Sequence, residues 1–218
     1  MPTPPLCLGP PDADAVVLLL HGFGADASDL AGLVPALALP GVRFVLPEAP
    51  VIRATLSGGW PVQAWYDIRS VQPSPDREDP VGVRASAVAL TALLQAEEDR
   101  GVPAARMVVA GFSQGGAMAL YCGLRYPRRL AGIVGMSSYL VLPATLDEES
   151  SPDNLVAPVW LAHGRQDDVV PLHRGEAVAK ALRAAGRPVR WQTWPMAHEI
   201  CREEQDALRS FLAEVLER

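Results

Sequence analysis

The sequence feature that most constrains the fold is the stretch Gly111-Phe-Ser-Gln-Gly115, which lies between two segments of different character. Before it, residues 106–110 form a short, mostly apolar run that predicts a buried strand. After it, residues 117–124 have helical character. Strand, sharp turn and helix are the setting in which Gly-x-Ser-x-Gly forms a nucleophile elbow, where glycines avoid collisions beside the exposed serine. The stretch therefore predicts that Ser113 is a nucleophile.

The rest of the chain alternates between apolar runs and amphipathic segments. Continuous apolar runs predict strands that are buried on both faces, as in a parallel sheet covered by helices. We expect strands at residues 13–20, 42–46, 106–110, 130–136, 158–162 and 188–194. We expect helices at residues 30–39 (capped by Ser28 and Asp29), 80–100, 117–124 and 171–185, and after His198. This alternation predicts an α/β fold, a mostly parallel sheet between two helical layers, in one domain spanning residues 1–218.

The composition is that of an ordinary globular protein with a mildly acidic balance. The 218 residues carry a net charge of −6, and 49% of them are hydrophobic. The negative charge argues against a nucleic-acid partner. Residues 107–124 are uncharged, but glycines and polar residues interrupt them, so we expect no stable membrane insertion.

The cysteines and the N-terminus indicate the compartment. The first ten residues lack the basic and apolar regions of a signal peptide. The three cysteines are an odd number without a framework spacing, which fits reduced thiols. The expected location is therefore the cytoplasm.

A nucleophilic serine needs a base and an orienting carboxylate, and these follow it in the chain order Ser, Asp or Glu, His when a strand–elbow–helix carries the serine. His198 follows the last expected strand and precedes the last helix, where the base belongs. His21 and His163 come too early in this order, and each ends a strand beside a glycine, where a structural hydrogen bond is the expected role. For the acid, the turn after residues 158–162 offers Asp167 and Asp168, and spacing alone does not choose between them.

The negative oxygen that forms during attack on a carbonyl needs two N–H donors. One donor follows the nucleophile, at Gln114. The other normally comes from the loop after an early strand, and His21-Gly-Phe-Gly24 fills that place with Phe23 as the donor.

Five motifs in order resemble those of the bacterial carboxylesterase and acyl-protein thioesterase family of small α/β-hydrolases. They are His21-Gly-Phe-Gly, Ala64-Trp-Tyr-Asp-Ile, Gly111-Phe-Ser-Gln-Gly-Gly, His163-Gly-x-x-Asp-x-x-Val-Pro and Met196-Ala-His. The resemblance implies a Ser113–Asp167–His198 triad, because the family's acid is the fifth residue of the His-Gly turn. It also implies hydrolysis of carboxylic esters or thioesters without a metal or cofactor, and homodimers in some members.

The expected function is a serine carboxylesterase that acts on short- to medium-chain esters through an acyl-enzyme. The alternatives are an acyl-protein thioesterase or lysophospholipase, which would need a longer apolar groove, and a non-catalytic binding module, against which the complete triad argues. Candidates for the acyl pocket come from the aromatic loop 56–66 and from residues 139–142. They are Leu56, Trp60, Trp65, Tyr139, Leu140 and Leu142.

Overall fold

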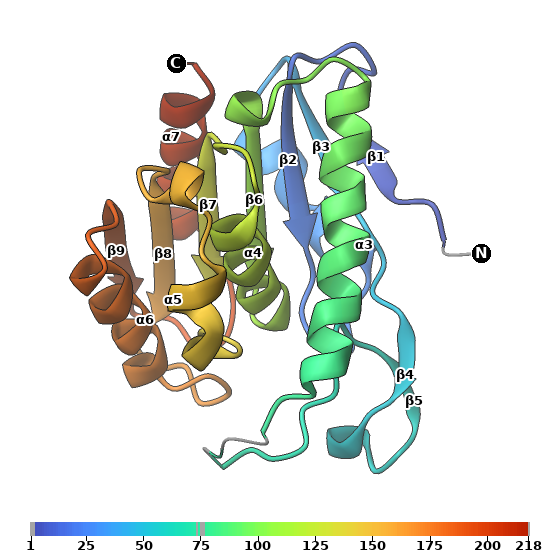
Figure 1. Ribbon diagram of the computed structural model, residues 1–218, viewed down its shortest axis with the longest axis vertical. Helices are drawn as coiled ribbons and strands as arrows, with labels where there is room; N and C mark the ends of the chain where they lie inside the picture. Colours follow the sequence, from blue (N-terminus) through green and yellow to red (C-terminus); the bar gives the residue numbers. More distant parts are fainter. Residues whose placement is uncertain (1–2, 73, 75–76, 218) are drawn as a thin grey trace.

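The computed structural model describes residues 3–72, 74 and 77–217, and its centre is a sheet of seven strands (Figure 1). Their order across the sheet is β1-β3-β2-β6-β7-β8-β9, and every neighbouring pair is parallel except β1 and β3. The strands are β1 (Leu6–Leu8), β2 (Ala15–Leu20), β3 (Val42–Leu46), β6 (Met107–Phe112), β7 (Gly132–Met136), β8 (Val159–Gly164) and β9 (Val189–Trp194).

Helices cover both faces of this sheet, and each face has its own apolar core. One core joins the sheet to α3, α4 and α6, and the other joins it to α1, α2 and α7. In Figure 1, α3 and α4 lie in front of the strands. The helices are α1 (Ala27–Ala31), α2 (Leu33–Leu37), α3 (Pro80–Asp99), α4 (Gln114–Arg125), α5 (Leu146–Glu149), α6 (Leu172–Ala184) and α7 (Arg202–Leu216). This is the three-layer α/β arrangement that the alternating pattern predicts.

The central strands explain the apolar runs in the sequence. Every residue of β2, β7 and β8 is buried, because helices cover both sides of these strands. The edge strand β9 instead alternates between half-buried and exposed residues over most of its length. The parallel strands direct their carboxyl ends to one edge of the sheet, which is where ligand sites of open α/β sheets lie.

In the first 40 residues, three local features differ from the sequence-based expectation. The first helix begins at Ala27 rather than at residue 30, because the Asp26 side chain accepts a hydrogen bond from the N–H of Ser28 and caps it. That helix also breaks at Gly32, so α1 and α2 replace one longer helix. The antiparallel strand β1 was not expected, since three residues are too few to show a hydrophobic period.

Within the long segment 48–79, part of the chain forms a separate hairpin of β4 (Val51–Arg53) and β5 (Pro61–Gln63). A short 3₁₀ turn at Thr55–Ser57 joins the two strands. Figure 1 shows the hairpin extending away from the main sheet. Residues 73, 75 and 76 of this segment lie outside the described residues. Further 3₁₀ turns lie at Ala104–Arg106, Pro143–Thr145 and Pro152–Asn154.

Among residues 3–72, 74 and 77–217, no helix has both the length and the apolar character needed to cross a membrane.

Candidate active site

Ser113 stands between β6 and α4 in a backbone conformation that L-residues rarely adopt. Its φ is 55° and its ψ is −120°, and its N–H donates to the carbonyl oxygen of Met136 on the neighbouring strand at 2.9 Å. A non-glycine residue in such a region costs on the order of 1–3 kcal/mol and persists only where surrounding contacts impose it. The strained turn is therefore the elbow that the flanking pattern predicts.

Gly111 and Gly115 lie two residues before and two residues after Ser113. Neither position has room for a side chain, because neighbouring backbone atoms are too close. A Cβ at Gly111 would lie 2.3 Å from the carbonyl carbon of Gly115, and a Cβ at Gly115 would lie 2.2 Å from the carbonyl oxygen of Leu20. Both obstacles are backbone atoms, which cannot rotate away. The elbow therefore packs directly on the end of β2, where the His21-Gly-Phe-Gly24 loop begins.

His198 links Ser113 to a carboxylate. Its Nε2 lies 2.9 Å from the Ser113 Oγ, and its Nδ1 lies 2.7 Å from Oδ2 of Asp167. The ring of Phe112 packs beside the imidazole, with 4.7 Å between ring centroids. The three side chains come from the elbow, the turn after β8 and the loop before α7, so the sheet edge assembles them in one place.

The turn after β8 distinguishes the two neighbouring acids. Asp167 is buried, and its Oδ1 accepts hydrogen bonds from the N–H groups of Val169 and Val170 at 3.0 and 2.7 Å. These bonds leave Oδ2 to face His198. Asp168 is exposed to solvent. The structure thus brings Asp167, and not Asp168, to the imidazole.

His163 lies beneath this turn and is fully buried. Its Nε2 lies 2.7 Å from the carbonyl oxygen of Val170 and 3.5 Å from Oδ2 of Asp167. The carbonyl can only accept, so Nε2 carries the ring proton and donates it. Burial lowers the pKa of His163, which keeps the ring neutral beside the carboxylate.

The expected N–H donors lie on two segments that meet at Ser113. Gln114 is the first residue of α4, and Ala117 is the first residue that bonds back, to the Ser113 carbonyl oxygen at 3.0 Å. The N–H of Gln114 therefore has no partner within the helix and lies at its positive end. On the other segment, a Cβ at Gly22 would lie 3.4 Å from the Ser113 Cβ, so Gly22 lies against the serine. The half-buried Phe23 follows it and lines the same cavity as Ser113.

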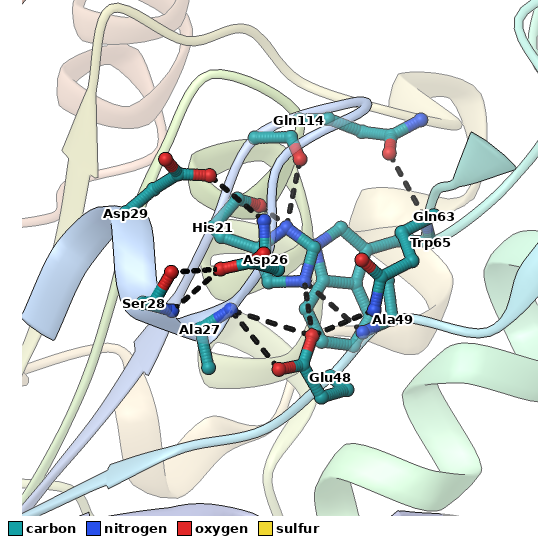
Figure 2. A network of polar contacts seen from close by, with 11 residues as sticks. His21, Asp26, Ala27, Ser28, Asp29, Glu48, Ala49, Gln63, Trp65 and Gln114 are labelled. Carbon is teal, nitrogen blue, oxygen red and sulfur yellow. Dashed lines mark hydrogen bonds and ion pairs between the residues drawn. The ribbon is translucent and has the colours of Figure 1, made fainter.

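Trp65 joins these two segments (Figure 2). Its indole N–H donates to the carbonyl oxygen of His21 at 2.8 Å, and its backbone N–H donates to Oε1 of Gln114 at 2.9 Å. The amide nitrogen of Gln114 in turn donates to the carbonyl oxygen of Tyr66 at 2.8 Å. Because these groups are buried, their hydrogen bonds define the relative position of the loop and the elbow.

Glu48 and Gln63 extend the same network toward the hairpin (Figure 2). The amide of Gln63 donates to Glu48 at 2.7 Å, and both Glu48 oxygens lie 3.3 Å from the N–H of Ala27. The N–H of Gly24 donates to the carbonyl oxygen of Gln63 at 2.8 Å. The loop before α1 and the first residue of α1 are thus bonded to two segments that are distant in sequence.

A cavity of about 590 Å³ opens beside Ser113 and His198. It lies between the loop and helices at residues 21–33 and the segment 199–205, and its size is typical of a site for a small ligand. Its wall combines apolar side chains with a few polar ones. They are Phe23, Leu30, Leu33, Phe112, Ile200, Asp29, Glu199 and Gln205.

The structure places none of the six expected acyl-pocket residues on the wall of this cavity. Trp65 and Tyr139 are buried, Leu140 and Leu142 are half-buried, and Leu56 and Trp60 are exposed. Hydrogen bonds hold Trp65 and Tyr139 away from the cavity wall. Trp65 bonds to His21 and Gln114, and the Tyr139 hydroxyl lies 2.8 Å from that of Tyr66. Trp60 belongs to the hairpin and is 75% exposed.

Sequence reasoning missed Leu30, Leu33 and Ile200 as lining residues. Leu30 and Leu33 follow the His21-Gly-Phe-Gly24 loop, and Ile200 follows His198 by two residues. The sequence signal that could have identified all three is their closeness along the chain to the Phe23 donor or to the base His198. In the part of the chain that the structure describes, no three His, Cys, Asp or Glu side chains are grouped so that they could hold a metal ion.

Comparisons with known proteins show which family this chain belongs to. A profile of the Phospholipase/Carboxylesterase family matches residues 9–216. Acyl-protein thioesterase 1 of Neurospora crassa is 38% identical over 93% of this chain and 87% of its own length. The crystal structure of Zea mays acyl-protein thioesterase 2 superposes with a TM-score of 0.84 at 30% identity, covering 97% of this chain and 98% of that one. The crystal structure of esterase PE8 superposes with a TM-score of 0.85 at 31% identity, covering 98% of this chain and 99% of that one.

Proposed function

Because this chain belongs to the phospholipase/carboxylesterase family, and so is an α/β-hydrolase that cleaves ester or thioester bonds, we propose that it is a serine carboxylesterase for short- to medium-chain acyl groups. The observation that carries this proposal is the continuous hydrogen-bonded path from Ser113 through His198 to Asp167 beside an open cavity. We assign the whole activity to one α/β-hydrolase domain, which the match over residues 9–216 supports.

In the proposed reaction, His198 Nε2 takes the proton of the Ser113 hydroxyl as the serine oxygen attacks the acyl carbon. Asp167 holds the ring by its Nδ1–H and stabilises the positive imidazolium. The N–H groups of Phe23 and Gln114 bind the oxygen that becomes negative. His198 then gives its proton to the departing alcohol or thiol, and a water molecule releases the acyl group by the same steps in reverse.

A second candidate function is acyl-protein thioesterase activity. The relatives from Neurospora crassa and Zea mays carry that name, and the first is 38% identical to this chain. Both reactions form the same acyl-serine and differ only in whether oxygen or sulfur leaves. The thioesterase would accept longer acyl chains, which need a longer apolar groove.

The test is a series of nitrophenyl esters from acetyl to palmitoyl, measured beside thioesters of the same acyl groups. We expect kcat/KM to peak at short or medium chains. A value that climbs to palmitoyl, with thioesters preferred over esters, would support the thioesterase instead. Failure to cleave any member of either series would refute the proposed function.

The location and oligomeric state stay predictions. Cys7, Cys122 and Cys201 are free thiols, which supports a reducing compartment such as the cytoplasm. A homodimer is expected only from the family resemblance, and light scattering on the purified protein would test it.

A further inference from the structure

His21 follows the last residue of β2 and is the first residue of the loop that approaches Ser113, and its ring is buried. The N–H of Ala49 points to its Nε2 at 3.1 Å, so this nitrogen accepts and carries no proton. A neutral imidazole has one protonated nitrogen, which here is Nδ1. Nδ1 lies 2.8 Å from the carbonyl oxygen of Gly22 and donates its proton to it.

The carbonyl that His21 holds belongs to the same peptide group as the N–H of Phe23. A peptide group is planar, and no cis bond occurs among the described residues, so its C=O and N–H point in opposite directions. A ring that fixes the Gly22 carbonyl therefore also fixes the direction of the Phe23 N–H. Donation to the carbonyl oxygen also polarises the amide, which makes its N–H a stronger donor.

The ring itself cannot turn freely. It packs against the indole of Trp65, with 5.1 Å between ring centroids, and the indole N–H donates to the His21 carbonyl oxygen. The Glu48 carboxylate lies 3.8 Å from Nε2, but the N–H of Ala49 is closer to that nitrogen and donates to it. The contacts with Ala49 and Trp65 thus set the tautomer and the orientation of the His21 ring (Figure 2).

We propose that His21 is a positioning residue for catalysis: its Nδ1–H aims and polarises the Gly22–Phe23 peptide so that the Phe23 N–H can bind the reaction's negative oxygen. This rests on the proposed function, because it presupposes attack by Ser113 on an acyl carbon. It assigns a catalytic consequence to a histidine that precedes the nucleophile in the chain and exchanges no proton with substrate.

Two amide substitutions separate the two hydrogen bonds of the ring. In His21→Asn the side-chain NH₂ is as many bonds from the backbone as Nδ1, so it can donate to Gly22. In His21→Gln the side-chain oxygen is as many bonds away as Nε2, so it can accept from Ala49 but leaves the Gly22 carbonyl without its donor. His173→Gln, at an exposed position on α6, is the matched control for the loss of an imidazole.

We expect kcat of His21→Gln to fall by about 10²-fold with KM changed little, as when an oxyanion donor is lost. His21→Asn should stay within about tenfold of the wild type, even where its melting temperature falls further than that of His21→Gln. Affinity for a trifluoromethyl ketone, which forms a tetrahedral adduct with the serine, should fall in parallel with kcat. Equal kcat in the two variants, or losses that follow melting temperature, would overturn the proposal.

Labelling with a fluorophosphonate separates this proposal from the proposed function. Wild-type protein labelled at Ser113, with equal kcat in the two His21 variants, refutes only the role of His21. Wild-type protein that is not labelled at Ser113 refutes the proposed function as well.

Discussion

The site has two sides that are held together in different ways. The oxyanion side comprises residues 21–29, 48–49 and 63–66 with Gln114, and the acid–base side comprises residues 163–170 and 196–201. Hydrogen bonds between segments 28 to 49 residues apart hold the first. Within the second, Asp167 bonds to Val169 and Val170 inside one short turn. One backbone hydrogen bond, from the N–H of Gln166 to the carbonyl oxygen of Met196, and the contact of Asp167 with His198 join that turn to the segment 196–201.

This difference matches what each side is proposed to do. Stabilising a negative oxygen needs donors that are already aimed, because reorientation during the reaction would lose the benefit. Transferring a proton needs a ring that can bind and release it, and His198 is the less buried partner, with a side chain that is 16% exposed against 0% for Asp167. Substitutions on the oxyanion side should therefore lower kcat at every pH, whereas those on the acid–base side should also alter its pH dependence.

The largest effect is expected where the two sides meet. Ser113→Ala should lower kcat by about 10⁶-fold, the loss seen when a triad serine is removed. The melting temperature should stay near that of the wild type, because removing a hydroxyl opens almost no space. Steady-state kinetics and thermal unfolding check both parts. Turnover within tenfold of the wild type would contradict the elbow assignment.

The next effect separates neighbours on the acid–base side. Asp167→Asn should lower kcat by about 10⁴-fold, the cost of the same change in a serine protease, because the amide favours the wrong imidazole tautomer. Asp168→Asn should change kcat by less than about tenfold, because the exposed charge is screened by solvent. Kinetics on both folded variants decide the matter, and the reverse order would move the triad to Asp168.

A smaller effect is expected in the cavity between the two sides. Ile200→Trp adds bulk to the cavity wall, so kcat/KM for an octanoyl ester should fall by about tenfold while that for an acetyl ester changes little. Trp60→Ala removes an exposed hairpin residue and should leave both values within about twofold. If Trp60→Ala selectively impairs the octanoyl ester, the acyl group binds along the hairpin instead.

The last prediction concerns stability rather than activity, and it involves Glu204 in the first turn of α7. Neither of its carboxylate oxygens has a hydrogen-bond partner among the described residues, and burial raises the pKa of this acid to about 8. Its pKa in the unfolded chain is near 4.5, so the folded state holds a proton that the unfolded state has lost between these values. The free energy of unfolding should therefore fall as pH rises from about 4.5 to about 8.

Glu204→Gln is uncharged at every pH and should remove this decline. Urea unfolding at pH 5 and pH 8 measures the free energy of unfolding of the variant and of the wild type. The variant's gain over the wild type should be larger at pH 8 than at pH 5, by an amount on the order of a few kcal/mol. Glu203→Gln, an exposed acid in the same turn, is the control and should leave the decline intact. An unchanged decline in Glu204→Gln would mean that this carboxyl is not the titrating group.

The fold and the acid–base side could be largely predicted from the sequence. The buried runs matched β2, β3, β6, β7 and β8 to within one or two residues at most ends, because helices on both faces leave no reason for polar residues in these strands. The chain order of serine, acid and base also carries spatial information, since each follows a strand whose carboxyl end meets the same edge of the sheet. Resemblance to a family then favoured Asp167, where spacing left two choices.

The oxyanion side shows where such reasoning ends. Nothing in the local sequence says whether Trp65 faces a cavity or packs beneath His21, because both positions suit an aromatic residue. The answer depends on hydrogen bonds to His21 and Gln114, which are 44 and 49 residues away. The expected pocket followed the aromatic residues, of which Trp65 and Tyr139 are buried and Trp60 faces solvent.

The contact between Gly115 and the end of β2 limits how this site can be reused in another protein. A Cβ at Gly115 would meet the carbonyl oxygens of both Leu20 and His21, at 2.2 and 2.4 Å, so the elbow and the neighbouring strand end share one surface. A pentapeptide grafted alone onto a different scaffold would carry the serine but not the complementary backbone. The smallest portable unit for an enzyme designer is thus the pair of strands β2 and β6 with their following loop and helix.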